Sequence, residues 1–317
     1  MSQLLLPSLE IQGFRGFQHL RIEHLERVNL IVGKNSVGKT SLLEALWLYA
    51  SNWNQYVERD ILRKRNEERQ APYDPKQLDY SNSVRHLFFN RPAAASNGQP
   101  AIVIGPIGSP MRFTPGTEPE GGGYHDHVII TVGGLLPHQV EQAWDAIALT
   151  DRQDYLLTAL RIIRPDIVDL NMISSQALGG NYVGRRVPFV RVKGSNAPVP
   201  LRSLGEGLAR LFILSLALAN ADNGLLLVDE IESGLHYSIQ PDMWRLMFTM
   251  AQELNIQVFA TTHSWDCIEG FQIVVATSGA GNDGLLVRLE QHGENITATL
   301  FDQRRLSIAT NELIEIR

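Results

Sequence analysis

A short glycine-rich segment constrains the fold of this chain more than any other feature of its sequence. It follows an apolar run, residues 28–32, and precedes residues 40–49, whose apolar side chains have helical spacing. The segment, Gly33-Lys34-Asn35-Ser36-Val37-Gly38-Lys39-Thr40, fits the pattern G-x-x-x-x-G-K-[ST], and Ser41 follows it. Backbone N–H groups of such a loop, and of the helix behind it, form a concave site for an anion. The sequence therefore predicts a phosphate-binding loop between a strand and a helix.

Each residue type in this loop has a physical role. Gly33 and Gly38 permit backbone conformations and a close approach that a Cβ atom would block. We expect Lys39 to reach the β- and γ-phosphates of a nucleotide and the Thr40 hydroxyl to ligate Mg²⁺. Further nucleotide-binding positions are expected at Asn35, Ser36 and Ser41. ATP and Mg²⁺ are the predicted cofactors; the alternative is a glycine-rich turn without a ligand.

Two carboxylates follow a second apolar run, residues 225–228. Asp229 stands where a Walker B aspartate completes the Mg²⁺ shell, usually through water. Glu230 stands where a carboxylate can polarise the attacking water, so we predict it to be catalytic. The plainer alternative is an acidic strand-to-loop turn. No Asn-Lys-x-Asp motif for guanine occurs, which argues against a small GTPase.

The composition is that of an ordinary globular protein. Of 317 residues, 44% are hydrophobic and 20% are charged, which excludes a disordered or fibrous chain. A net charge of −6 argues against a broad basic face for nucleic acid, although not against a local patch. The single cysteine, Cys267, excludes an intramolecular disulfide and a zinc site built from cysteines. We expect a cytoplasmic protein, because the sequence shows neither a signal peptide nor an apolar run of about 18 residues.

The order of the apolar runs predicts an α/β fold with a parallel sheet. Strands are expected at 9–17, 20–24, 28–32, 169–173, 189–192, 225–229 and 257–261, and helices at 205–220 and 239–255. A helical region is expected from 137 to 165. Residues 102–104 and 128–132 are expected to pair as a hairpin, with a mobile Gly- and Pro-rich loop at 105–123.

These elements are interpreted as a single domain with four parts. They are an N-terminal lobe (1–50 and 93–135), a charged, mostly helical insertion (51–92), a helical lobe (136–220) and a last part with C-terminal strands (221–317). The insertion carries nine charges within 57–70, including Arg59, Arg63, Lys64, Arg65 and Arg69. Their spacing places them mostly along one side of a helix. A solvated helix face is the plain interpretation, and a contact for a partner or DNA is the functional one.

Four further segments occur in an order typical of one family. They are Ile11-Gln-Gly-Phe-Arg-Gly-Phe17, Ser203-Leu-Gly-Glu-Gly207, Glu232-Ser-Gly-Leu-His236 and Thr261-Thr-His-Ser264. With these segments the chain resembles the ABC-type ATPase heads of the SMC, RecF and OLD groups, most closely the OLD-like AAA15 ATPases. The resemblance implies a P-loop NTPase of the ABC-ATPase head type. Such a fold has a mixed core sheet, a helical lobe and an antiparallel N-terminal subdomain.

The resemblance also assigns roles to residues outside the phosphate loop. It implies that Arg15 approaches the nucleotide and that His263 is the family's switch histidine, a catalytic group. Ser203, Gly205 and Glu206 belong to the signature motif, which in the family meets the γ-phosphate bound to the other subunit. Two plainer alternatives remain: a capping box of Ser203 and Glu206 at the start of a helix, and a purely structural His263. The family's Q-loop glutamine is not placed, with Gln77 and Gln99 as the nearest candidates.

The function implied by the resemblance is an ATPase that dimerises head-to-tail around two ATP molecules, with hydrolysis resetting the dimer. The chain has no long coiled coil, and the 47 residues after Gly270 are too few for the nuclease domain of OLD proteins. We therefore expect a separately encoded effector, such as a TOPRIM-type nuclease in phage defence or DNA metabolism, with nucleic acid as a further candidate partner. The alternatives are a membrane transporter's nucleotide-binding subunit and an ATP-dependent scaffold with little turnover. Leu204, where transporters have glycine, argues against the first, and Glu230 argues against the second.

Overall fold

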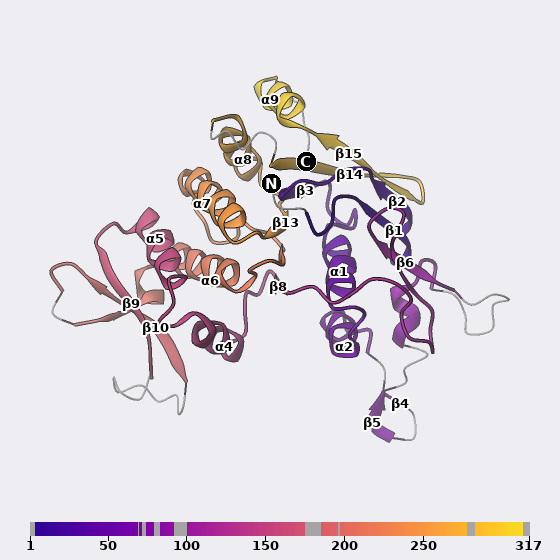
Figure 1. The fold of residues 1–317 in the computed structure, drawn as a ribbon, viewed down its shortest axis with the longest axis horizontal. Helices are drawn as coiled ribbons and strands as arrows, with labels where there is room; N and C mark the ends of the chain where they lie inside the picture. The colour runs from indigo at the N-terminus through magenta and orange to yellow at the C-terminus, as the bar shows by residue number, and fades with distance from the viewer. Residues whose placement is uncertain are drawn as a thin grey trace.

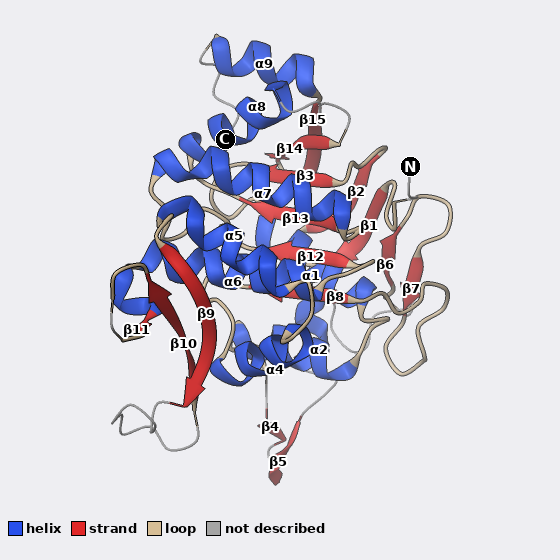
Figure 2. Cartoon of the chain, turned by 60° about the vertical axis from the view of Figure 1, so that its left-hand side comes forward, coloured by secondary structure: helices blue, strands red, loops and turns tan. Residues whose placement is uncertain are grey.

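The computed structural model describes residues 4–68, 70–71, 74–78, 83–91, 100–174, 185–195, 197–277 and 283–312. In this part of the chain, the central element is a six-stranded mixed sheet (Figure 2). Its order is β15 (Asn295–Phe301), β14 (Gly284–His292), β3 (Val28–Val32), β13 (Gln257–Thr261), β12 (Leu225–Val228) and β8 (His127–Ile130). Neighbours from β14 to β8 pair in parallel, whereas β15 pairs antiparallel with β14. The parallel sheet predicted from the sequence is therefore present.

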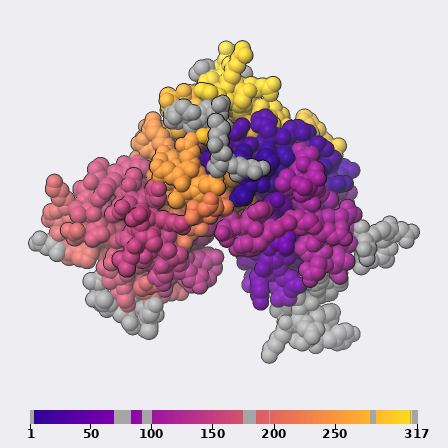
Figure 3. All heavy atoms as spheres, in the orientation of Figure 1, coloured from indigo at the N-terminus to yellow at the C-terminus, as the bar shows by residue number. Residues whose placement is uncertain are grey.

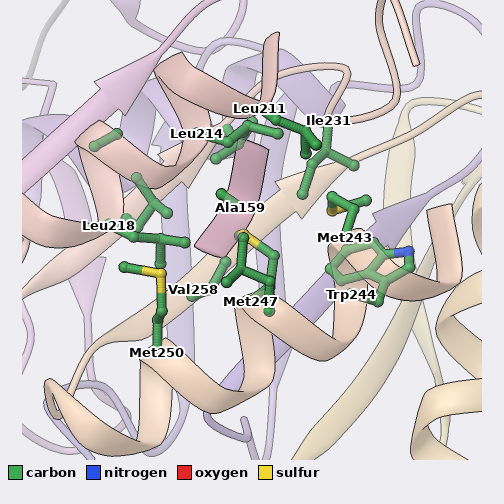
Figure 4. Packing of buried hydrophobic residues seen from close by; sticks show 14 of the residues in the cluster. Ala159, Leu211, Leu214, Leu218, Ile231, Met243, Trp244, Met247, Met250 and Val258 are labelled. Atoms are coloured by element: carbon green, nitrogen blue, oxygen red, sulfur yellow. The ribbon is translucent and has the colours of Figure 1, made fainter. Parts of the chain in front are cut away.

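Both faces of this sheet are covered, which explains why its inner strands are apolar throughout. In β12, Leu226 and Val228 enter one hydrophobic core, and Leu225 and Leu227 enter another, as the alternation of a strand requires. The first core packs the helices α4 (Pro137–Ile147), α5 (Gln153–Ile163), α6 (Glu206–Asn220), α7 (Gln240–Glu253), α8 (Trp265–Thr277) and α9 (Gln303–Asn311). The second packs α1 (Lys39–Ala50), which Figure 1 shows on the other side of the sheet from α6 and α7. Figure 4 shows the first core, where Leu211, Met247 and Val258 meet from three elements.

An antiparallel sheet joins α1 in the second core. Its order is β2 (Phe17–Ile22), β1 (Leu9–Phe14), β6 (Ile102–Gly105) and β7 (Met111–Phe113). The predicted hairpin of 102–104 with 128–132 is wrong, because β6 pairs with β1 and β7 while β8 joins the central sheet. The expected loop at 105–123 contains β7 and a bridge between Arg112 and Glu120. The predicted strand at 9–17 is interrupted by a turn at Arg15, whose φ is +49°.

The helical lobe contains the two strands predicted at 169–173 and 189–192, as β9 (Ile167–Ser174) and β10 (Arg186–Val192). The region expected to be helical from 137 to 165 is two helices, α4 and α5, separated at Leu149, which has a φ of +65°. A three-stranded sheet, in the order β11 (Val199–Pro200), β10 and β9, lies beside α5 in the described part of this lobe. The helix expected from Gly205 begins one residue later, after the turn η3 (Leu201–Leu204).

The charged insertion is only partly helical. It contains α2 (Gln55–Lys64) and the turn η1 (Arg85–Leu87), but also the paired strands β4 (Gln70–Ala71) and β5 (Asp74–Leu78). Trp53 and Glu58 fix the start of α2, because the indole Nε1 donates to the Glu58 carboxylate at 2.7 Å. Gln77 lies in β5, whereas Gln99 and Arg69 fall outside the described residues.

The molecule has two lobes separated by a notch, visible at the lower edge of Figure 3. One lobe carries α4, α5 and β9, and the other carries α1, α2 and the antiparallel sheet (Figure 1). None of the helices in the described ranges combines the length and the apolar character that a membrane span requires.

Candidate nucleotide site

The phosphate loop lies where β3 enters α1. Gly33 has a φ of +143°, and a Cβ atom there would lie 2.5 Å from the carbonyl oxygen of Leu289 on β14. Only glycine fits this position, because both the backbone angle and the close approach exclude a side chain. Gly38, with a φ of +107°, is the N-cap of α1, so the N–H groups of the first turn have no side-chain cap. Lys34, Asn35 and Ser36 are exposed along the loop. The loop thus presents free N–H groups at the positive end of a helix.

Lys39 is folded onto its own loop. Its ammonium group donates to the carbonyl oxygens of Gly33 at 2.6 Å and Lys34 at 3.0 Å. The residue is 5% exposed. Burial lowers its pKa, and the charges of Asp229, Glu230 and Glu232 oppose that shift. The cation is therefore held at the loop before any anion arrives.

Asp229 connects the loop to two strands. The Thr40 hydroxyl donates to its Oδ2 at 3.1 Å, and the Thr261 hydroxyl donates to its Oδ1 at 2.6 Å. A hydroxyl and a carboxylate oxygen at this distance, beside a phosphate loop, are the hard oxygen ligands that Mg²⁺ prefers. The donor set fits Mg²⁺, with Thr40 and Asp229 as the residues that would hold it.

Glu230 lies beside the predicted switch histidine. Its Oε1 is 3.7 Å from Nε2 of His263, and both side chains are more than a third exposed. The His263 backbone N–H donates to the Glu232 carboxylate at 3.0 Å. One carboxylate and one imidazole therefore face the same solvent-accessible region, next to Asp229 and Lys39.

Arg15 lies in a buried ion network on the other side of the loop. Its Nε is 2.7 Å from Glu44 on α1, and its Nη1 is 3.0 Å from Glu67, which follows α2. The Arg15 side chain is 6% exposed, and its Nη2 has no hydrogen-bond partner among the described residues. Burial lowers the pKa of Arg15, while Glu44 and Glu67 oppose the shift. The arginine is held rigidly and keeps one donor for a further group.

A cavity of about 460 Å³ opens between this network and the phosphate loop. It is lined by Arg15, Gly16, Ser36, Gly38, Ser41, Arg65, Glu67, His86, Phe88, Asn90 and Arg91. Arg65 ties the insertion to α1, since it donates to Glu44 at 2.8 Å and to the Ser41 hydroxyl at 3.2 Å. Lys64 and Arg63 form ion pairs with Asp60 and Glu68 instead. The cations of the insertion therefore do not form one face: Arg65 lies at the candidate nucleotide site.

The contacts of the signature residues are local to their own turn. Ser203 is exposed, and its hydroxyl donates to the Pro200 carbonyl at 2.7 Å. Glu206 is exposed, and its Oε1 lies 3.6 Å from Nε of Arg202. Gly205, with a φ of +121°, is the N-cap of α6 and caps it without a side chain, so the capping-box alternative is wrong. The helix start is left open toward solvent.

Three side chains at this site were not predicted from the sequence. Glu44 and Glu67 complete the Arg15 network, and Arg210 of α6 donates to the carbonyl oxygens at the end of β12. Arg210 alone carried a signal, because it is a charged residue within the apolar stretch of a helix. The carboxylates gave none, since ordinary helix surfaces carry many like them.

Two family models match the chain. One, described as "AAA ATPase domain", matches residues 5–83, which include the phosphate loop. The other, described as "AAA domain, putative AbiEii toxin, Type IV TA system", matches residues 136–266, from α4 to the segment after His263.

Relatives of known sequence differ in how much they share. An "ATP/GTP phosphatase" of Helicobacter pylori is 23% identical over 92% of this chain and 94% of its own length. One uncharacterized protein of Methanocaldococcus jannaschii is 43% identical over 16% of this chain and 22% of its own length. A second is 30% identical over 31% of this chain and 83% of its own length. A DNA replication and repair protein RecF of Lachnoclostridium phytofermentans is 30% identical over 28% of this chain, which spans 26% of that protein.

Among solved structures, SMC heads share the fold. An SmcHead bound to the C-winged helix domain of ScpA has a TM-score of 0.56 at 13% identity. Its alignment covers 94% of this chain and 97% of the SmcHead chain. The SMC head domain from Thermotoga maritima has a TM-score of 0.51 at 16% identity and covers 94% of this chain and 100% of its own. At these identities the likeness concerns the fold alone.

Proposed function

Because the chain belongs to the SMC/RecF-like group of ABC-type ATPases, we propose that it binds ATP with Mg²⁺ and hydrolyses it between two copies arranged head-to-tail. Each copy contributes its phosphate loop, Asp229 and Glu230 to one nucleotide. Each also contributes Ser203, Gly205 and Glu206 to the nucleotide of the other copy. The substrate is a nucleoside triphosphate in water, and the products are the diphosphate and phosphate.

One observation carries this proposal: the residues of the site divide into two groups on one chain. A hydrogen bond joins Thr40 to Asp229, whose charge acts on Lys39, whereas the hydroxyl of Ser203 donates to the Pro200 carbonyl of its own turn. The signature residues leave a helix N-terminus uncapped, which favours an anion there. A second copy would place that N-terminus over the phosphates of the first.

The chain's own residues then have distinct roles. Lys39 exchanges two carbonyl acceptors for phosphate oxygens, and charge-assisted bonds favour that exchange. Mg²⁺, when bound through Thr40 and Asp229, neutralises phosphate charge. Glu230 accepts a proton from the attacking water, and His263 beside it orients that carboxylate or the γ-phosphate. Arg15 and Arg65 hold the cavity toward which the ribose and base extend.

Mixed dimers test the arrangement directly. Ser203→Arg should retain ATP binding but block turnover, because a bulky cation would occupy the place of the hydroxyl. Lys39→Ala should lose ATP binding in its own copy. In a mixture of the two, one composite site carries both lesions and the other carries none. Turnover should rise toward about a quarter of the wild-type value, since half of randomly formed dimers are mixed and each has one intact site. If mixing restores no activity, the sandwich arrangement is refuted.

A separately encoded effector is the second part of the proposal, with a cytoplasmic location. One matching family is described by a toxin–antitoxin system, and one structural neighbour was solved bound to ScpA. A head that changes its dimeric state with ATP can transmit that state to a partner, such as a nuclease acting on DNA. A pull-down with tagged Glu230→Gln protein tests this, in parallel with and without ATP. A partner enriched only with ATP is expected; no ATP-dependent partner would favour a self-contained ATPase.

A further inference from the structure

Arg210 is a buried cation at the centre of the ATPase machinery. It lies on α6, one turn beyond the signature residues, and is 8% exposed. Its Nη2 donates to the carbonyl oxygen of Glu230 at 2.7 Å and to that of Asp229 at 3.3 Å. Burial lowers the pKa of Arg210, and Glu232, Glu230 and Asp229 oppose that shift. An arginine keeps its proton in such a setting and donates in a fixed geometry.

Glu230 has an unusual backbone that depends on these contacts. Its φ is +48°, in the left-handed region that a residue with a Cβ seldom adopts. Its N–H donates to the Thr261 hydroxyl at 2.9 Å, and its carbonyl accepts from Arg210 and from the Ser233 N–H at 3.0 Å. Side chains from β13 and α6 therefore hold both polar backbone groups of one residue. A backbone held in this way fixes the direction in which the Glu230 carboxylate leaves the chain.

The start of α6 packs directly on the segment that follows Glu230. A Cβ atom on Gly207 would lie 3.5 Å from the carbonyl oxygen of Gly234, and one on Gly234 would lie 4.0 Å from Cβ of Arg210. Gly234 itself has a φ of +78°. The first turns of α6, Arg210 and the loop after Glu230 thus form one packed unit.

We propose that Arg210 is a positioning residue that holds the Glu230 carboxylate of its own subunit in the hydrolytic orientation. This inference rests on the proposed function, because Glu230 must activate water for its orientation to matter. It gives helix α6 two roles: its exposed N-terminus serves the nucleotide of the other copy, and Arg210 serves the carboxylate of its own.

Single variants test the positioning role. Arg210→Met removes the side-chain donor and keeps an apolar stem of similar length, so the Glu230 carbonyl loses the contact with α6 and retains the N–H donor of Ser233. Because small misplacement of a catalytic group costs up to about 100-fold, turnover should fall roughly 10- to 100-fold while the ATP dissociation constant stays within about twofold. Arg210→Lys keeps one charged donor and should recover part of the turnover. A wild-type rate in Arg210→Met would overturn the proposal, as would a loss of ATP affinity equal to the loss of turnover.

Arg152→Met is the matched control. Arg152 also donates to a backbone carbonyl of α6, that of Ala219 at 3.2 Å, but at the far end of the helix. The same substitution there perturbs the helix without reaching Glu230. It should leave turnover unchanged; a matching loss would show that any disturbance of α6 suffices and would overturn the specific role of Arg210.

Mixed dimers decide in which subunit Arg210 acts. With Arg210→Met and Ser203→Arg in different copies, one site carries both defects and the other is intact, so turnover should rise on mixing. With Arg210→Met and Glu230→Gln, each site carries one defect, so turnover should not rise. The reverse pattern would assign Arg210 to the signature motif of the neighbouring site and overturn the proposal. The Ser203→Arg and Lys39→Ala mixture serves as reference: if it alone fails, the sandwich is refuted, and the separation of turnover from affinity in Arg210→Met still tests positioning.

Discussion

Lys39 shows how a single residue prepares the site for its ligand. Its ammonium group donates two hydrogen bonds to loop carbonyls and is nearly buried. Binding of ATP therefore requires no long search by a flexible side chain, only a change of acceptors. The side-chain entropy that an exposed lysine would lose on binding, up to about 2 kcal/mol, has already been lost here.

Lys39→Ala should weaken ATP binding roughly 10- to 100-fold, because one hydrogen bond to a charged group contributes about 1.5–3 kcal/mol. A fluorescent ATP analogue titrated against both proteins measures the effect. Circular dichroism checks that the fold of the variant is unchanged. An unchanged affinity would contradict the assignment of the loop.

Glu230→Gln should leave ATP affinity intact and lower turnover about 10²- to 10⁴-fold, because an amide cannot accept the proton of the attacking water. Its backbone contacts to Thr261 and Arg210 involve main-chain atoms and persist in the variant. Phosphate release under saturating ATP measures the change. Turnover at the wild-type rate would mean that another group is the base.

At the scale of elements, α2 is the segment whose role differs most from the sequence-based expectation. The charged residues of this segment predict a solvated or partner-binding face. In the structure, Arg65 instead donates hydrogen bonds to Glu44 and Ser41 of α1. Periodicity along one helix cannot show this, because the partners lie about 20 residues earlier in the chain. The same reason explains why the sequence predicted the wrong partner for β6: its true partner, β1, is distant in the chain.

Arg65→Met should weaken ATP binding about 2- to 10-fold, the effect of losing one hydrogen bond of roughly 0.5–1.5 kcal/mol beside the cavity. Arg63→Met, two positions earlier and in an exposed ion pair with Glu68, is the control and should not change it. Titration of both variants with the same analogue separates the two roles. If both variants bind ATP with the same affinity, Arg65 does not support the nucleotide site, and the insertion is better explained as a contact for a partner or DNA.

At the scale of the whole molecule, the sequence predicted what is local and missed what is distant. The phosphate loop, Asp229-Glu230 and the segment at His263 were found because each is a short motif at a strand end. The sheet edge that gathers them follows from parallel pairing of β3, β13 and β12. The partners of Arg15 and the side-chain contacts of the Glu230 backbone join residues between 20 and 52 positions apart, and among them only Arg210 had a sequence signal, its charge within an apolar helix.

The uncapped start of α6, exposed at Ser203 and Glu206, leads to the central claim, an ATP-dependent dimer. The most direct test is the molar mass of Glu230→Gln protein by light scattering, with Mg²⁺ and either ATP or no nucleotide. The account predicts a monomer of 35.4 kDa without nucleotide and a mass twice as large with ATP, because hydrolysis no longer resets the sandwich. Ser203→Arg introduced into the same protein should return the mass with ATP to that of the monomer. A monomer under both conditions at tens of micromolar protein would contradict the account.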